Sequence, residues 1–196
     1  MKYLSQLIIA TCFSVVAFAQ PTRFYTDPQA LFQEAKEYFQ KDQFSLAYPL
    51  FKELRRNTRE TDRISAPVTA QEIDYYTIVC ALKQNEGRAE DEAKQYIDVE
   101  KNEAREQMMN FHLAEYYFRS QRFGEAVAQY ENAGIANLSN REIADMKFHQ
   151  AYGFFTMQRF NEAKPLFQSI AALKDDPNYL DANYYYGFLA FRDRQY

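Results

Sequence analysis

A small residue is followed twelve positions later by an alanine at four places along this chain. Small side chains let two helix backbones approach closely, and larger side chains at fixed offsets can fill the space around the crossing. The recurrence therefore predicts stacked helical hairpins, each of which needs its neighbours to bury its apolar face. The four pairs are Ala35 and Ala47, Ala81 and Ala93, Ala114 and Ala126, and Ala151 and Ala163.

Aromatic residues recur at fixed positions relative to these alanines. In three of the four units they stand 3, 9 and 16 residues after the first alanine. The second unit departs from the pattern, because Gln84 and Glu90 replace two of the aromatic residues and Ile97 occupies the third position. The regular units contain Tyr38, Phe44 and Phe51; Tyr117, Phe123 and Tyr130; and Phe154, Phe160 and Phe167.

The composition agrees with a helical solenoid. A chain of 196 residues with 47% hydrophobic and 26% charged residues fits one globular domain with a continuous core. It contains only 5 Gly and 6 Pro, which favours long helices over the turn-dense pattern of an all-β domain. We therefore expect an all-α chain, with a lead-in at 20–27 and units at about 28–56, 69–104, 107–138, 140–176 and 177–196, the last of them incomplete.

Signals for helix starts fall between these units. Thr69 with Glu72, and Ser139 with Glu142, have the spacing of a capping box, in which the hydroxyl and the carboxylate each satisfy free amides. Two further starts are predicted where an aspartate precedes a proline, which tolerates the first helical position because its missing N–H has no partner there. These are Asp27 before Pro28, and Asp176 before Pro177.

Two other prolines fall inside the predicted second helices. An internal proline removes a backbone hydrogen bond and costs about 3 kcal/mol unless it lies near the first turn. We therefore expect these helices to begin late or to bend at Pro49 and Pro165.

The first nineteen residues have the pattern of a secretory signal peptide. Lys2 provides a positive start, Leu7–Phe18 is a short apolar run, and Ala17 and Ala19 flank a cleavage site. The run is shorter than the roughly 20 residues that cross a bilayer, which favours cleavage over a retained anchor. We therefore expect an exported protein, periplasmic or associated with the outer membrane.

The two cysteines predict no disulfide. Cys12 lies in the signal segment, where Thr11 stands in place of the small residue that lipoprotein signals use, so lipidation is the weaker alternative. Cys80 would be the only thiol left after cleavage, which excludes an intrachain disulfide. Its apolar neighbours predict a small buried side chain.

Charge and motifs argue against nucleic acid and catalysis. The formal net charge is −4, and acidic residues interrupt the densest basic run, Lys52–Arg63, whereas phosphate binding needs clustered Lys and Arg. The sequence has no nucleophile elbow, phosphate-binding glycine loop or calcium loop, so we expect no enzyme and no cofactor. His112 and His149 occupy the same place in adjacent units, but two histidines without a nearby carboxylate or thiol make a poor metal site.

The repeating residues resemble the tetratricopeptide repeat (TPR) family. The resemblance covers roughly residues 28–196 and extends to exported TPR proteins of the Gram-negative cell envelope. The absence of Trp and the irregular second unit depart from the family pattern. The matching residues are Leu113, Ala114, Tyr117, Ala126 and Tyr130, with Asp176, Pro177 and Asn178 similar to the junction between units.

The resemblance implies a right-handed superhelix, without catalysis, whose first helices line a concave groove for an extended peptide or a partner helix. Some members of the family hold a peptide carboxylate with paired Lys and Asn, but here Lys36 is matched by Leu82 and Glu115, so this clamp is not expected. Helical aromatic stripes are usually core, so packing between neighbouring helices is the alternative role for each of these aromatic residues. By matching position, the groove candidates are Phe32, Lys36, Phe39, Ile78, Leu82, Phe111, Glu115, Phe118, Arg119, Phe148, Tyr152, Phe155, Tyr184, Phe188 and Phe191.

These features lead to two functional hypotheses. The first is a non-catalytic scaffold that binds another protein in its groove. The alternative is a helical-repeat protein that binds glycans at the cell surface, suggested by 16 Tyr and 17 Phe but weakened by the lack of Trp. Because Tyr184, Gly187, Ala190 and Tyr196 repeat the start of a further unit, we also expect the sequence to be the N-terminal part of a longer array.

Overall fold

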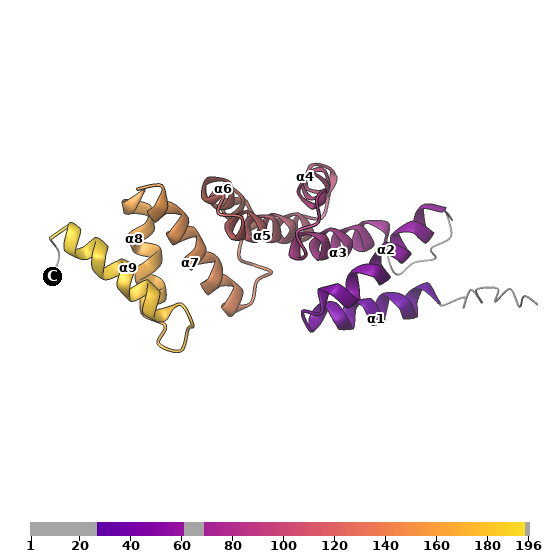
Figure 1. The fold of residues 1–196 in the computed structure, drawn as a ribbon, viewed down its shortest axis with the longest axis horizontal. Helices are drawn as coiled ribbons and strands as arrows, with labels where there is room; N and C mark the ends of the chain where they lie inside the picture. Colours follow the sequence, from indigo (N-terminus) through magenta and orange to yellow (C-terminus); the bar gives the residue numbers. More distant parts are fainter. Residues whose placement is uncertain (1–26, 61–68, 195–196) are drawn as a thin grey trace, which may run out of the picture.

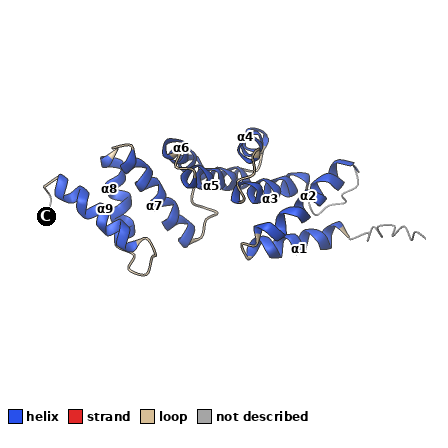
Figure 2. Cartoon of the chain, viewed as in Figure 1, coloured by secondary structure: helices blue, strands red, loops and turns tan. Residues whose placement is uncertain are grey.

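A computed structural model describes residues 27–60 and 69–194 of the chain. The predicted signal peptide at 1–19 and all but the last residue of the 20–27 lead-in lie outside the described residues. Within the described ranges the chain forms nine helices and no strand (Figure 2). The helices are α1 Pro28–Gln40, α2 Phe44–Glu60, α3 Ala70–Lys83, α4 Ala89–Val99, α5 Glu103–Arg119, α6 Phe123–Ala133, α7 Asn140–Thr156, α8 Phe160–Ala171 and α9 Tyr179–Arg192.

The helices form a row of hairpins in chain order, from α1 at one end to α9 at the other (Figure 1). Each odd-numbered first helix from α1 to α7 packs against the second helix that follows it, and each second helix also packs against the next first helix. Consecutive elements are therefore the main packing partners, as in a solenoid. The predicted fold class, an all-α solenoid of stacked helix hairpins, is confirmed.

Alanines and aromatic rings hold each hairpin together as the sequence predicted. In α7 and α8, the side chains of Ala151 and Ala163 are fully buried at the crossing. The ring of Phe148 lies 5.8 Å from that of Phe167, and Phe155 lies 5.5 Å from Phe160. Matching ring pairs occur in the other two regular hairpins: Phe32 with Phe51 and Phe39 with Phe44, and Phe111 with Tyr130 and Phe118 with Phe123.

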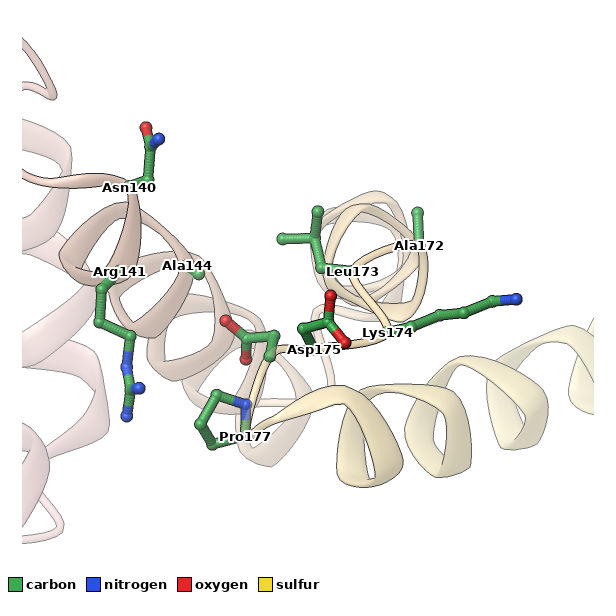
Figure 3. A pocket seen from close by; sticks show the side chains of 9 residues that line it. Asn140, Arg141, Ala144, Ala172, Leu173, Lys174, Asp175 and Pro177 are labelled. Atoms are coloured by element: carbon green, nitrogen blue, oxygen red, sulfur yellow. The ribbon is translucent and has the colours of Figure 1, made fainter.

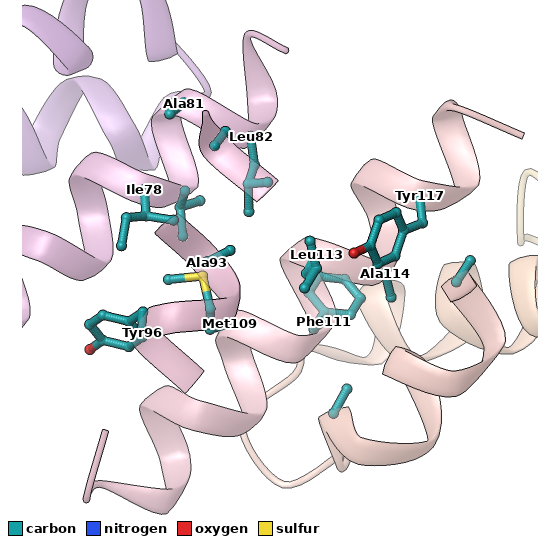
Figure 4. Packing of buried hydrophobic residues seen from close by; sticks show 14 of the residues in the cluster. Ile78, Ala81, Leu82, Ala93, Tyr96, Met109, Phe111, Leu113, Ala114 and Tyr117 are labelled. Carbon is teal, nitrogen blue, oxygen red and sulfur yellow. The ribbon is translucent and has the colours of Figure 1, made fainter. Parts of the chain in front are cut away.

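The irregular second unit lies in the middle of the solenoid and has a buried core of its own. Ala81 and Ala93 are buried there as in the other units, together with Ile78 and Leu82 of α3. Figure 4 shows these side chains beside Met109 and its neighbours on α5. Ile78 therefore takes the place of the buried ring of the other units, and Tyr75 and Tyr96 are also buried in this unit.

Three of the four predicted helix starts carry a side-chain cap. Asp27 accepts a hydrogen bond from the amide of Gln29, and Ser139 forms a complete capping box with its N3 glutamate. Thr69 accepts a hydrogen bond from the amide of Glu72, which is one half of the capping box predicted there. The prediction for Asp176 was wrong, because α9 begins later, at Tyr179. The carboxylate of Asp176 instead accepts a hydrogen bond from the amide of Asn178, 2.8 Å away, within the loop before the helix.

Of the two alternatives expected for the proline-containing helices, a late start was wrong, and a bend at the proline stays a prediction. The second helices begin at Phe44 and Phe160, five residues before Pro49 and Pro165. Proline at this place removes only one backbone hydrogen bond. The first turn is retained because its aromatic residue is anchored on the preceding helix, as Phe160 is on Phe155.

Candidate protein-interaction surface

The predicted groove residues differ in the exposure of their side chains: some are buried, some half-buried and some exposed. In the four complete hairpins, the residue three positions before the first alanine, which we call the small marker, is buried in the core; Ile78 is one of these, and Leu82 is buried as well. These buried rings contact the second helix of their own unit and cannot present a face to a partner. Buried are Phe32, Phe111 and Phe148; half-buried are Lys36, Phe39, Glu115, Phe118, Tyr152 and Phe155; exposed are Arg119, Tyr184, Phe188 and Phe191.

Five of the rings on first helices form a connected series, which we call the aromatic ladder: Phe118, Tyr152, Tyr185, Phe155 and Phe188. Its members lie on α5, α7 and α9. Successive ring centroids are 6.0, 5.6, 5.0 and 5.8 Å apart, and all four contacts are edge-to-face or tilted. The ladder is partly exposed along its length, so it offers an apolar surface that crosses three consecutive units.

Sequence reasoning missed Tyr185, although it links the rings of α7 to those of α9. Tyr185 stands two residues before Gly187, which is the register of His112 and His149 before their own small residues. His149 lies beside the ladder, with its ring stacked on Phe118 at 3.9 Å. That shared register was the signal that could have identified Tyr185.

A polar cluster joins α5, α6 and α7 next to the ladder. The carboxylate of Glu115 accepts hydrogen bonds from the Tyr130 hydroxyl and from His149 Nδ1, the latter at 2.9 Å. Burial raises the pKa of Glu115, but these hydrogen bonds outweigh it and leave the pKa below its ordinary value. Because Glu115 is committed to this cluster, its role is to join adjacent units.

The two histidines have different environments despite their matching positions. His112 is buried, with Nε2 3.1 Å from the Tyr75 hydroxyl, and burial lowers its pKa to about 3. It is therefore neutral at physiological pH, whereas His149 is paired with the carboxylate of Glu115. In the described part of the chain, no group of three His, Cys, Asp or Glu residues is arranged to hold a metal ion.

A basic corner lies at the C-terminal ends of α3 and α5, close to the start of the ladder. One guanidinium nitrogen of Arg119 donates to the carbonyl oxygen of Leu82 at 2.9 Å. The ammonium of Lys83 lies 5.7 Å from the centre of the Phe44 ring, and burial together with the charge of Arg119 lowers its pKa. Neither cation forms a salt bridge within the described ranges.

Two shallow hollows occur away from the ladder. The larger, of about 560 Å³, lies between the start of α7 and the loop before α9 (Figure 3). Arg141 contributes a positive charge to it and Asp175 a negative one. The smaller, of about 270 Å³, lies between the first turns of α3 and α5, beside Tyr75 and Met108. Neither combines a nucleophile, a base and an oxyanion site in the way that catalysis requires.

The chain is similar in structure to MamA, a TPR-like helical solenoid. A mutant form of MamA matches with a TM-score of 0.62 at 15% identity, covering 86% of this chain and 88% of the other. The structure named MamA MSR-1 C2 matches with a TM-score of 0.61, also at 15% identity, covering 86% and 87%. No family model and no curated protein matches the sequence. At this identity the likeness shows the fold: a TPR-like arrangement of helix pairs.

None of the described helices is both long and apolar enough to cross a bilayer.

Proposed function

We propose that this protein is a non-catalytic scaffold of the cell envelope that binds a peptide or a helix of another protein along the first helices of its solenoid. The observation that carries the proposal is the aromatic ladder, a partly exposed apolar surface bordered by the basic corner of Lys83 and Arg119. A surface of this kind combines apolar contact with a polar rim, as protein interfaces do. The signal-like sequence at 1–19 supports an exported location, periplasmic or at the outer membrane.

The chemistry of the ladder favours a partner with apolar side chains and at least one acidic group. Aromatic rings bury large areas at small cost in conformational entropy, which is why they are enriched among interface hot spots. A carboxylate beside the ladder would complete the pairing of two cations that lack ion partners within the described ranges. The resemblance to TPR proteins, whose first helices line their groove, supports the same face.

Site-specific photocrosslinking in the native host tests the proposal. Tyr152 or Phe188 is replaced by p-benzoylphenylalanine, and covalent adducts are identified by mass spectrometry after irradiation. Leu46 serves as the matched control, because it is an exposed apolar residue on α2, a second helix outside the ladder. We expect both ladder positions to capture the same protein and the control position not to capture it.

Adducts equally strong at the control position, or none at the ladder positions, would contradict the assignment of the surface. Titration of the purified chain with a panel of polysaccharides addresses the alternative. Saturable glycan binding that Tyr152→Ser abolishes, without any protein adduct, would replace the scaffold proposal by a glycan-binding one.

A further inference from the structure

The smaller hollow, between α3 and α5, combines a carboxylate with two aromatic rings. It has a volume of about 270 Å³ and is bounded by one side of α3, the start of α5 and the loop before α7. Glu72 stands three residues before Tyr75 and four before Tyr76, so all three lie on one side of α3. Aromatic faces beside a negative charge are the environment in which proteins bind organic ammonium ions. The hollow therefore has the residue types of a cation site.

Contacts beneath the hollow hold its two tyrosine rings in position. The hydroxyl of Tyr75 lies 3.1 Å from Nε2 of the buried His112. The ring of Tyr76 is stacked on that of Phe51, with the centroids 5.1 Å apart. The two tyrosine rings are themselves 5.2 Å apart and nearly perpendicular. Because Phe51 covers one face of Tyr76, a cation that approaches this ring must use its other face.

The two charged side chains that line the hollow, Glu72 and Arg105, differ in how well their charges are compensated. The guanidinium of Arg105 donates two hydrogen bonds to the carboxylate of Glu100, at 2.9 and 3.1 Å. Glu72 has one cation beside its carboxylate within residues 27–60 and 69–194, namely Lys36, at 3.9 Å. That distance is beyond a hydrogen bond. The hollow therefore favours an added positive charge over an added negative one.

The ammonium group of Lys36 shows how a cation is placed next to these groups. Besides its contact with Glu72, it lies 5.6 Å from the centre of the Tyr76 ring and 5.4 Å from that of Phe32. Both distances are within the roughly 6 Å of a cation–π interaction. Lys36 reaches Glu72 and Tyr76 from α1, whereas the hollow lies between α3 and α5. The same carboxylate and ring are therefore within reach of a cation from either place.

From this arrangement we infer that the hollow binds a small organic ammonium ion, which competes with Lys36 for the carboxylate of Glu72 and the ring of Tyr76. The alkyl part of the ion lies against Met108, which lines the hollow on α5. Lys36 acts as a tethered competitor, because the fold keeps its ammonium beside the same two groups. The site is separate from the aromatic ladder, whose first member, Phe118, lies near the other end of α5.

Titration of the purified chain with n-butylammonium chloride tests this inference, because this ion has the length and charge of a lysine side chain. Binding is followed at constant ionic strength by the NMR signals of the Tyr76 and Met108 amides and of the Asn137 side chain. n-Butanol and butyrate are the controls, since they have a similar shape without the positive charge. We expect saturable shifts with butylammonium at millimolar concentration and much smaller shifts with either control.

Two substitutions should change the affinity for butylammonium in opposite directions. Glu72→Gln removes the negative charge and should weaken binding about threefold, as expected for a partly exposed ion pair. Lys36→Met removes the competing ammonium and should strengthen binding about threefold for the same reason. Lys52→Met is the matched control, because the ammonium of Lys52 lies 4.2 Å from the Tyr48 ring on α2. The control should leave the affinity unchanged.

Circular dichroism checks that each variant keeps its helices, and Lys36→Gln takes the place of Lys36→Met if the latter does not. Equal shifts with n-butanol, or no saturable shift with butylammonium, would overturn the inference. So would an affinity that is unchanged or weaker in the Lys36 variant, because Lys36 would then not compete for the site. Tyr152→Ser, on the ladder, should leave butylammonium binding unchanged, which separates this test from that of the proposed function.

Discussion

Replacing Phe148 by alanine should destabilise the fold, although its sequence position predicted a surface role. The ring is 9% exposed and packs edge-to-face on Phe167, whose own ring is fully buried. Large-to-small changes at such a site cost about 3–5 kcal/mol, because the lost burial adds to the cavity that remains. The remaining exposure places Phe148→Ala near the lower end, at about 3 kcal/mol. For a chain of this size, that corresponds to a decrease in melting temperature of roughly 6–12 °C.

Tyr184→Ala provides the internal control, because Tyr184 has the same repeat position but is 69% exposed. Its replacement should change the free energy of unfolding by less than about 0.5 kcal/mol. Urea unfolding followed by circular dichroism at 222 nm measures both, with the midpoint and the slope fitted separately because repeat arrays can unfold in parts. Equal losses for the two variants would refute the conclusion that the second helix of each hairpin decides which rings belong to the core.

Three further predictions concern single groups. The pKa of Glu115 is lowered in the folded state, so its contribution to stability is present above the unfolded pKa and is lost as the pH falls through the folded pKa. Glu115→Gln should therefore lower the free energy of unfolding at pH 7 and flatten its decrease between pH 5 and pH 3 in urea titrations. An unchanged acid profile would contradict this. Burial raises the pKa of Cys80 to about 12, so in a Cys12→Ser background the thiol should react with Ellman's reagent only after unfolding in urea; rapid reaction of the native chain would show that the site is open. Ser139→Ala removes the capping box and should cost about 1 kcal/mol of stability in the same urea assay. Ser169→Ala removes only a hydrogen bond to a carbonyl oxygen of its own helix and should be nearly neutral. Equal effects of the two variants would exclude capping as the cause.

The hairpins could be predicted from sequence because close packing of two helices requires the same residue types at the same spacing in every unit. Alanine at each crossing and a ring 16 residues after it are required by the geometry of two helices in contact, and this requirement recurs with every unit. The second unit was harder to identify because Gln84, Glu90 and Ile97 stand where the other units carry aromatic residues, and its buried rings, Tyr75 and Tyr96, lie at other positions. Helix starts were predictable where a side chain caps an amide, as at Ser139, and failed at Asp176, whose carboxylate caps a loop amide instead.

The candidate surface was less predictable than the fold. Position on a first helix does not say whether a ring is buried, because that depends on which neighbouring helix covers it. Phe111 and Phe148 were therefore proposed for the groove, but they lie under the second helices of their units. The basic corner was missed because Lys83 and Arg119 are far apart in sequence and meet only when α3 and α5 pack together.

Two positions of each first helix therefore have different roles. The ring three residues before the small marker is used in the same way by every regular hairpin, so it cannot distinguish one partner from another. The residue directly after the marker carries the differences where it is at least partly exposed, because it changes from a cation at one end of the solenoid to a phenol and a phenyl ring at the other. A partner lying along this row would meet charge at one end and aromatic rings at the other, so its two directions would not be equivalent, and one orientation would be favoured. The row open to a partner consists of Lys36, Tyr152 and Phe188, because Leu82 is buried and Glu115 is held in the polar cluster.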